Sequence, residues 1–81
     1  MMIELLLFAS SKDLFGKPRI SIELSNEATV GDLKAALKER QPDAASLIQR
    51  CAFSVDQQYA TDTTVILAKH EIAMIPPVSG G

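Results

Sequence analysis

Short runs of apolar and polar residues follow one another along the chain and predict strands and a helix. Residues 3–9 form a nearly continuous apolar run interrupted by Glu4, which is typical of a strand buried on both faces. Residues 19–24 alternate between apolar and polar positions, which is typical of a strand with one buried face. A Gly-Lys-Pro turn signal at residues 16–18 indicates a hairpin of these two strands, with a short helical turn starting at residues 10–13.

The middle of the chain predicts one main helix. Thr29 is a suitable N-cap, and Asp32 completes an imperfect capping box, with Asp in the place of Glu or Gln. Pro42 ends the helix near Arg40, because proline disfavours helical backbone at the residue before it. One face of the helix is apolar and consists of Val30, Leu33, Ala36 and Leu37.

The second half of the chain predicts a further helical turn and three short strands. We expect the helical turn at residues 43–50 and the strands at 51–55, 59–60 and 71–75, with a turn at 56–58. The core is expected to be covered at one end by Val65, Ile66 and Leu67. Strands on both sides of one helix are typical of an α+β domain, so residues 1–75 should form a sheet with the main helix packed on one face.

Composition narrows the class of protein. The 81 residues suffice for one small domain, and 47% apolar with 22% charged residues fits a soluble globular protein. The net charge of −2, without a basic stripe, argues against nucleic-acid binding. No basic region precedes the short apolar run near the N-terminus, and no run approaches the ~20 residues of a membrane span. We therefore expect a cytoplasmic protein with no membrane or nucleic-acid partner.

The side chains offer no catalytic constellation. Cys51 is the single cysteine and His70 the single histidine, which is too few ligands for a metal motif. We interpret Cys51 as a small buried residue at the start of a strand and His70 as a solvated turn residue. A Cys–His nucleophilic pair would require the two to be adjacent in space, which the sequence leaves open. The sequence thus predicts no bound cofactor or metal and no catalytic side chain.

The last six residues are the candidate reactive segment, an extended tail: Pro76, Pro77, Val78, Ser79, Gly80 and Gly81. The two prolines remove backbone donors, so strand pairing should stop at Ile75. The tail carries no charged side chain, and its final glycines lack the Cβ that would hinder passage through a narrow channel. Fully extended, it can reach roughly 20 Å. We expect a mobile tail that presents the terminal carboxylate to another protein.

This ending resembles that of the small, sulfur-carrying subunit of molybdopterin synthase, a family of the ubiquitin-like β-grasp group. The resemblance extends to residues 6–12, to 29–33 at the helix start, to 53–60 and to the last strand, 72–75. It implies a mixed β-grasp sheet with one main helix on one face and a mobile Gly-Gly tail. Many family members carry Asn where this chain has Asp56, a difference in a predicted turn.

The resemblance also implies a chemistry for Gly81. Its carboxylate is ionised at neutral pH and a poor electrophile, so another protein must activate it. The family's route is adenylation with ATP by an enzyme that resembles the ubiquitin-activating class, followed by conversion to a thiocarboxylate. The tail then enters the large catalytic subunit and donates sulfur to a pterin precursor, which forms the dithiolene of molybdopterin. The AMP adduct and the thiocarboxylate are transient covalent states.

The resemblance also indicates which residues face a partner protein, although less directly than it indicates the role of Gly81. Phe8, Met74 and Ile75 match positions in the family's first and last strands, and we expect them to form an apolar patch that meets the large subunit and the activating enzyme, with Lys12 as a contact at its rim. The apolar members of this set are alternatively core residues, and Lys12 is alternatively a solvated turn charge. Three other functions stay open: a sulfur carrier for thiamin synthesis, a ubiquitin-like protein modifier, and a β-grasp binding module with an idle tail.

Overall fold

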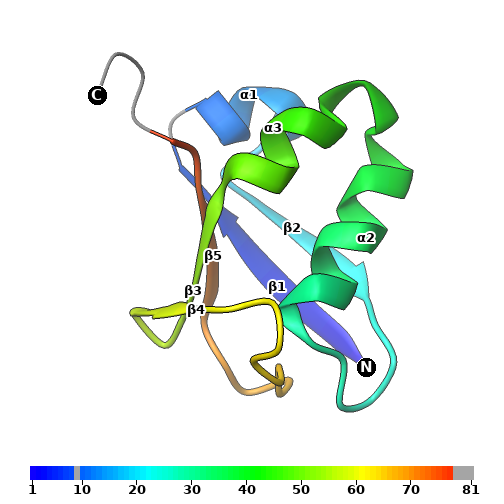
Figure 1. The fold of residues 1–81 in the computed structure, drawn as a ribbon, viewed down its shortest axis with the longest axis vertical. Helices are drawn as coiled ribbons and strands as arrows, with labels where there is room; N and C mark the ends of the chain where they lie inside the picture. The colour runs from blue at the N-terminus through cyan, green and yellow to red at the C-terminus, as the bar shows by residue number, and fades with distance from the viewer. Residues whose placement is uncertain (9, 78–81) are drawn as a thin grey trace.

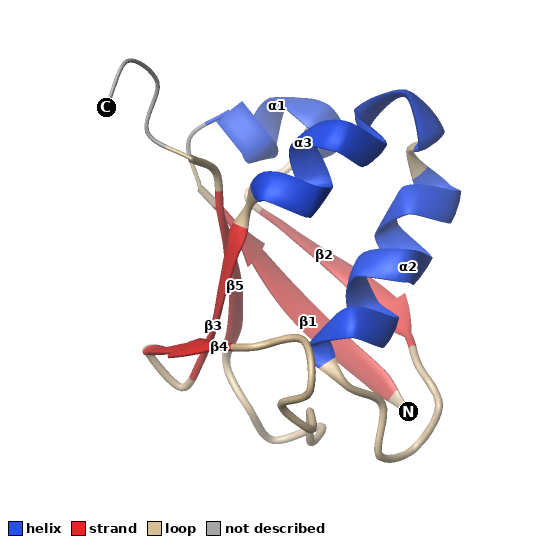
Figure 2. Ribbon diagram, viewed as in Figure 1, coloured by secondary structure: helices blue, strands red, loops and turns tan. Residues whose placement is uncertain are grey.

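The structure is a computed structural model that describes residues 1–8 and 10–77. Five strands form one sheet in the order β2-β1-β5-β3-β4. Figures 1 and 2 show the helices gathered on one side of this sheet. The α+β class and the mixed sheet are therefore confirmed. In chain order the elements are β1 (Met2–Leu7), α1 (Ser10–Phe15), β2 (Arg19–Glu23), α2 (Val30–Arg40), η1, a 3-10 helix (Pro42–Ala44), α3 (Ala45–Arg50), β3 (Ala52–Val55), β4 (Gln58–Ala60) and β5 (Ile72–Ile75).

Strand β1 lies between β2 and β5 in the sheet, and these two neighbours run in opposite directions to each other. It is antiparallel to β2, which confirms the predicted hairpin, and parallel to β5, with Leu7 opposite Met74. Strand β3 is antiparallel to both β5 and β4. Because β1 and β5 run the same way, their carboxyl ends meet at one edge of the sheet. Phe8 and Pro76, the residues that follow the two strands, therefore leave the sheet at the same end.

The core occupies only the side of the sheet that the helices cover. In β1, Ile3, Leu5 and Leu7 are buried, whereas Met2 and Glu4 are exposed. The prediction that this strand is buried on both faces is therefore wrong. Alternate residues of a strand point to opposite faces, and all the helices lie on one of them, so the even-numbered side chains face outward.

Helix α2 forms as its sequence predicts. The Asp32 N–H donates to Thr29 Oγ1 at 3.2 Å, and the Thr29 N–H donates to Asp32 Oδ2 at 2.9 Å, so the capping box is complete despite the shorter acid. The next two donors, the Val30 and Gly31 N–H groups, bond the carbonyls of Thr64 and Asp62. These bonds tie the start of the helix to the long connection between β4 and β5. The helix ends at Arg40, and its buried residues are Val30, Leu33 and Leu37.

The connection from β4 to β5 covers the core with one residue rather than three. Ile66 is fully buried, and its N–H donates to the Ala28 carbonyl. Val65 and Leu67 are 46% and 42% exposed, so the prediction that both cover the core is wrong. The chain is locally extended here, with an isolated bridge between Val65 and Thr29, and its side chains alternate in direction.

Between α2 and β3 the chain forms the predicted helical segment, as η1 followed by α3. Ile48 is fully buried there, and Leu47 packs partly buried against the core. Cys51 follows α3 and is buried, as the sequence predicts. None of the helices within residues 1–8 and 10–77 is both long and apolar enough to cross a membrane.

Candidate functional site

The root of the predicted tail is the first part of the site. Strand β5 ends at Ile75, where the prolines predict that pairing stops. Pro76 is half-buried and Pro77 exposed. The remaining candidate tail residues lie outside the described residues: Val78, Ser79, Gly80 and Gly81. The structure therefore fixes where the tail begins, at the carboxyl ends of the two parallel strands.

The second part is the sheet face that no helix covers, which we call the open face. The pairing register places Leu6 beside Ala73, Ala73 beside Ser54, and Ser54 beside Tyr59, in a row across four strands. A hollow of about 370 Å³ lies along this row. Five of the residues that line the hollow form an apolar surface, which we call the open-face strip: Leu6, Phe8, Tyr59, Ala73 and Ile75.

The open-face strip has the properties of a protein-binding surface. Phe8 is 50% exposed and Tyr59 is 79% exposed, although both are large aromatic side chains. Large apolar groups gathered on one face, rather than scattered singly, are typical of interaction sites. Tyrosine is also among the residues that contribute most to binding at interfaces, because it combines a large rigid ring with a polar tip. The strip ends at Ile75, so it is continuous with the root of the tail.

The structure separates the four predicted interface residues. Phe8 lies on the open-face strip and is half exposed, so it is not a core residue. Ile75 lies on the strip and is partly buried, and Lys12 is exposed on α1, where it lines a neighbouring hollow with Phe8. Met74 is fully buried, so its assignment to an interface is wrong and the core alternative holds. Adjacent strand residues point to opposite faces, so Ile75 can lie on the strip only if Met74 points into the core.

Three members of the strip, Leu6, Tyr59 and Ala73, are missed by reasoning from sequence. The apolar run predicts that Leu6 belongs to a doubly buried strand, although Leu6 and Phe8 are two residues apart and therefore point to the same sheet face. The sequence predicts correctly that Tyr59 lies in a short strand, yet nothing in its neighbourhood indicates that it is the most exposed large apolar residue in the described part of the chain. The alternation of side-chain direction along β1 is the signal that could have placed Leu6 on the open face. The position of Tyr59 follows only from the order of the strands.

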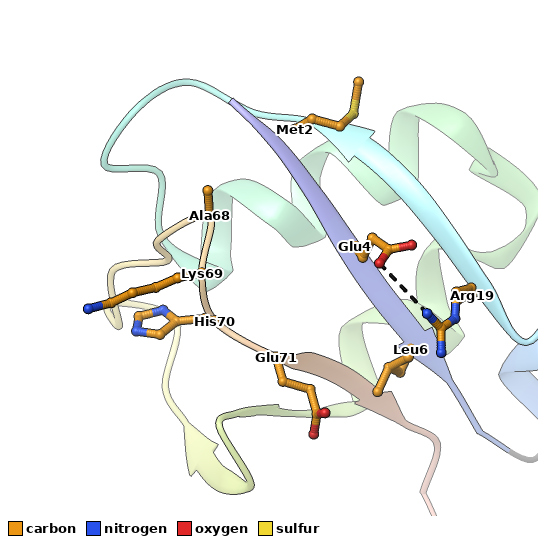
Figure 3. A pocket seen from close by; sticks show the side chains of 8 residues that line it. All are labelled: Met2, Glu4, Leu6, Arg19, Ala68, Lys69, His70 and Glu71. Atoms are coloured by element: carbon orange, nitrogen blue, oxygen red, sulfur yellow. Dashed lines mark ion pairs between the residues drawn. The ribbon is translucent and has the colours of Figure 1, made fainter.

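A second hollow on the same face is polar (Figure 3). It lies between β1, β2 and the residues before β5, and Figure 3 shows the Glu4–Arg19 ion pair on one side with Lys69 and His70 on the other. The Glu4 and Arg19 side chains are 3.7 Å apart and each 61% exposed. Exposed pairs of this kind stabilise a protein by well under about 1 kcal/mol. This hollow is therefore a solvated rim beside the open-face strip.

Neither Cys51 nor His70 belongs to a catalytic pair. Because β3 and β5 are antiparallel with Ala52 opposite Ile75, the two residues lie at opposite ends of that ladder, roughly 15–20 Å apart. Burial raises the pKa of the Cys51 thiol, and the nearby Arg50 and Lys34 charges offset this only in part. The thiol is therefore protonated at neutral pH and a poor nucleophile.

His70 is a structural turn residue rather than a purely solvated one. Its ring is part of a turn in which the Leu67 N–H donates to His70 Nδ1 at 2.9 Å and the His70 N–H donates to the Leu67 carbonyl at 3.0 Å. The interpretation as a solvated side chain needs correction to that extent, since the residue is half-buried. Within the described parts of the chain, no three His, Cys, Asp or Glu side chains are grouped to hold a metal ion.

The fold and site define a small β-grasp domain with an exposed apolar face next to the root of its C-terminal segment. Comparison of the sequence with known families shows that the chain belongs to the ThiS family, whose profile matches residues 5–81. It is 34% identical over 83 residues to the molybdopterin synthase sulfur carrier subunit of Chlamydomonas reinhardtii, covering 100% of both chains. It is 40% identical over 81 residues to the protein of that name from Dictyostelium discoideum, covering 96% of this chain and 94% of the relative.

Solved structures agree with the fold. The small archaeal modifier protein 1 of Haloferax volcanii superposes with a TM-score of 0.80 at 26% identity, covering 95% of this chain and 98% of that one. A chain from the complex of subunits 1 and 2 of the Helicobacter pylori molybdopterin-converting factor gives a TM-score of 0.68 at 21% identity, covering 100% of both. The ubiquitin-like β-grasp fold, which the resemblance implied, is thereby confirmed.

Proposed function

We propose that this protein is the sulfur-carrier small subunit of a molybdopterin synthase, with the carboxylate of Gly81 as the group that carries sulfur. The observation that carries the proposal is the continuity between the open-face strip and the root of the tail at Ile75 and Pro76. Near full-length similarity to relatives of that name supports the same function. The Pro-Pro-Val-Ser-Gly-Gly ending supplies the reactive terminus.

The geometry explains how such a carrier would work. A large subunit that binds the open-face strip holds the end of β5 in place, next to its own surface. The six residues from Pro76 to Gly81 then reach roughly 20 Å into a cleft of that subunit. Two prolines stiffen the start of the tail, so less conformational entropy is lost on insertion. Binding of the protein's folded domain therefore positions the tail, so that a bimolecular sulfur transfer becomes effectively intramolecular.

The proposed chemistry takes place at the terminal carboxylate in two stages. In the first stage a carboxylate oxygen of Gly81 attacks the α-phosphorus of ATP on an activating enzyme, and pyrophosphate leaves. A sulfur nucleophile at the oxidation level of sulfide then adds to the acyl carbon of the adenylate and displaces AMP, which leaves a thiocarboxylate. In the second stage the thiocarboxylate sulfur attacks a carbon of the pterin precursor within the large subunit, an oxygen substituent of that carbon leaves, and two such transfers supply the two dithiolene sulfurs. Hydrolysis of the resulting thioester returns the Gly81 carboxylate. No side chain of the carrier takes part in these bond changes.

A second candidate function is protein modification, favoured by the similarity in fold to the archaeal modifier protein. A modifier would form an isopeptide bond between Gly81 and a lysine of another protein after the same adenylation. The two functions share the adenylation of Gly81 and differ in the nucleophile that displaces AMP. The products separate them, since one is a carrier of almost unchanged mass and the other a set of larger conjugates.

The test uses the intact mass of the protein purified from its own cells, followed by reconstitution with the large subunit. We expect a fraction whose mass corresponds to one oxygen replaced by sulfur, and dithiolene formation when a chemically prepared thiocarboxylate is added. The matched control lacks Gly81, which withdraws the reactive carbonyl by roughly 3.5 Å and should abolish transfer. Full transfer by the shortened chain, or a ladder of conjugates without sulfur exchange, would contradict the carrier function.

A further inference from the structure

The hairpin turn between β3 and β4 has an unusual backbone. Val55 pairs with Gln58, so the turn has two central residues, Asp56 and Gln57. Both have positive φ, 51° at Asp56 and 68° at Gln57. Positive φ at both positions is the signature of a type I′ turn, which favours Asn or Asp at the first position and Gly at the second. Glutamine at the second position is therefore unfavourable for folding, because its Cβ crowds the left-handed backbone.

The first of the two residues is explained by the fold. The Asp56 N–H donates to the Glu71 carbonyl at 2.7 Å, and Asp56 Oδ1 accepts from the Glu71 N–H at 2.8 Å. These bonds extend the β3–β5 ladder by one pair beyond Val55 and Ile72. The Asp56 carboxylate accepts the hydrogen bond from the Glu71 N–H in place of the Asp56 backbone carbonyl, because the left-handed backbone turns that carbonyl away from β5. Asp56 is thus retained for a contact within the domain.

No such contact explains Gln57. Its side chain is exposed, and it makes no hydrogen bond or ion pair with any of the residues that the structure describes. It nevertheless lines the hollow of the open face together with Ser54 and Tyr59. A side chain that strains its own backbone, has no hydrogen-bond or ion-pair partner among the described residues and lines the hollow of the open face is a candidate for recognition.

We propose that Gln57 is a specificity-determining residue whose carboxamide hydrogen-bonds to the large subunit when that subunit occupies the open-face strip. The inference rests on the proposed function and deepens it. Gln57 lies at the β3–β4 end of the strip, whereas Phe8 and Ile75 lie at the end next to the tail. The strip supplies apolar area, and the hairpin supplies a directional polar contact that fixes how the partner is oriented.

The surroundings also indicate the chemistry of the group that faces Gln57. Glu71 lines the hollow with Gln57, and the Asp56 carboxylate lies next to it, bonded to the Glu71 N–H, so two acidic side chains make the local potential negative. A hydrogen-bond donor on the partner, such as an arginine side chain or a backbone N–H, is favoured there over a carboxylate. The Gln57 carbonyl oxygen is the acceptor that such a donor would find.

The experiment compares stability with affinity in three single variants, using the purified large subunit as the probe. Gln57→Gly should raise the melting temperature by about 2–5 °C, because glycine accepts the left-handed conformation. The same variant should weaken binding about threefold to tenfold, the usual effect of losing one hydrogen bond. Gln57→Ala should weaken binding equally without raising the melting temperature, which separates loss of the carboxamide from added flexibility.

The chain offers a matched control at Glu27, which also has positive φ, 65°, and is exposed in the loop between β2 and α2. Glu27→Gly should raise the melting temperature slightly less than Gln57→Gly does, because an acidic side chain near the N-terminus of α2 is lost. It should leave the affinity for the large subunit unchanged. Unchanged affinity in both Gln57 variants, with wild-type binding intact, would overturn this inference and leave the proposed function standing. Failure of the wild-type protein to bind the large subunit would overturn both.

Discussion

The two faces of the sheet are built from the same five strands, yet they serve opposite purposes. On the covered face, Leu5, Leu33 and Met74 are fully buried and pack between sheet and helices. On the open face, Phe8 and Tyr59 expose half or more of their surface to solvent. Apolar residues occur on both faces, so the apolar character of a residue does not by itself show on which face it lies. The difference lies in whether the apolar surface is covered within the chain or remains for a partner.

Adjacent residues of β5 illustrate the contrast most directly. Met74 and Ile75 are neighbours of similar size and apolar character, but Met74 is fully buried in the core and Ile75 lies on the open-face strip. Truncating the first should affect stability, and truncating the second should affect association. The two faces can therefore be tested separately, the covered face by stability and the open face by association.

The largest expected effect is on association. Phe8→Asp places a charge at the tail end of the open-face strip, where binding would have to bury it without a partner. We expect loss of measurable binding to the large subunit in titration calorimetry, while the melting temperature changes little because Phe8 is half exposed. Lys12→Ala is the matched control, since this exposed cation lies beside Phe8 and its loss should change affinity by less than about threefold. Undiminished binding by a folded Phe8→Asp protein would remove the open face from the interface.

The next effect in size is on stability and concerns the covered face. Leu37 is fully buried where α2 packs on the sheet, so Leu37→Ala should lower the free energy of unfolding by about 2–5 kcal/mol. Leu6→Ala, at a partly buried position on the open face, should cost about 1 kcal/mol or less. Urea unfolding followed by circular dichroism measures both. Equal losses in the two variants would show that the faces are not energetically distinct.

A smaller effect is expected at the hairpin that borders the open face. Asp56→Ala removes the acceptor of the Glu71 N–H and should lower stability by about 1 kcal/mol, a typical value for one exposed hydrogen bond. Asp56→Asn keeps an acceptor and tolerates positive φ, so it should be nearly neutral. Thermal melting of the pair is the measurement. A loss in Asp56→Asn as large as that in Asp56→Ala would mean that charge, rather than the acceptor, matters at this position.

The smallest effect is a dependence of stability on alkaline pH. Burial raises the pKa of the Cys51 thiol above its ordinary value of 9.0, so the folded state holds its proton at pH values where the unfolded state loses it. This contribution to stability is fully present below pH 9 and is lost as the pH rises toward the folded-state pKa. Stability of the wild-type protein should therefore decline above pH 9 more steeply than that of Cys51→Ala. Parallel curves for the two proteins in urea titrations at pH 8 to 10.5 would contradict this cause.

Much of the fold could be predicted because its signals are local. The capping box at Thr29, the helical spacing of Leu33 and Leu37, and the alternation along β2 depend on residues close in sequence, and all appear in the structure. The end of β5 at Ile75 follows from the prolines beside it. These features need no knowledge of the rest of the molecule, because backbone sterics and short-range hydrogen bonds decide them.

What the tertiary structure decided is which apolar residues are covered. An apolar run such as that of β1 is equally compatible with a strand buried on one face or on both, and only the placement of all helices on one side resolves it. The same placement assigned Met74 to the core and left Phe8 and Tyr59 exposed. The strand order then brought Tyr59, Ala73 and Leu6 together in one row from three distant parts of the chain. Burial depends on contacts between segments far apart in sequence, so the chain by itself determined the elements and the tail, and packing decided which surface remains for a partner.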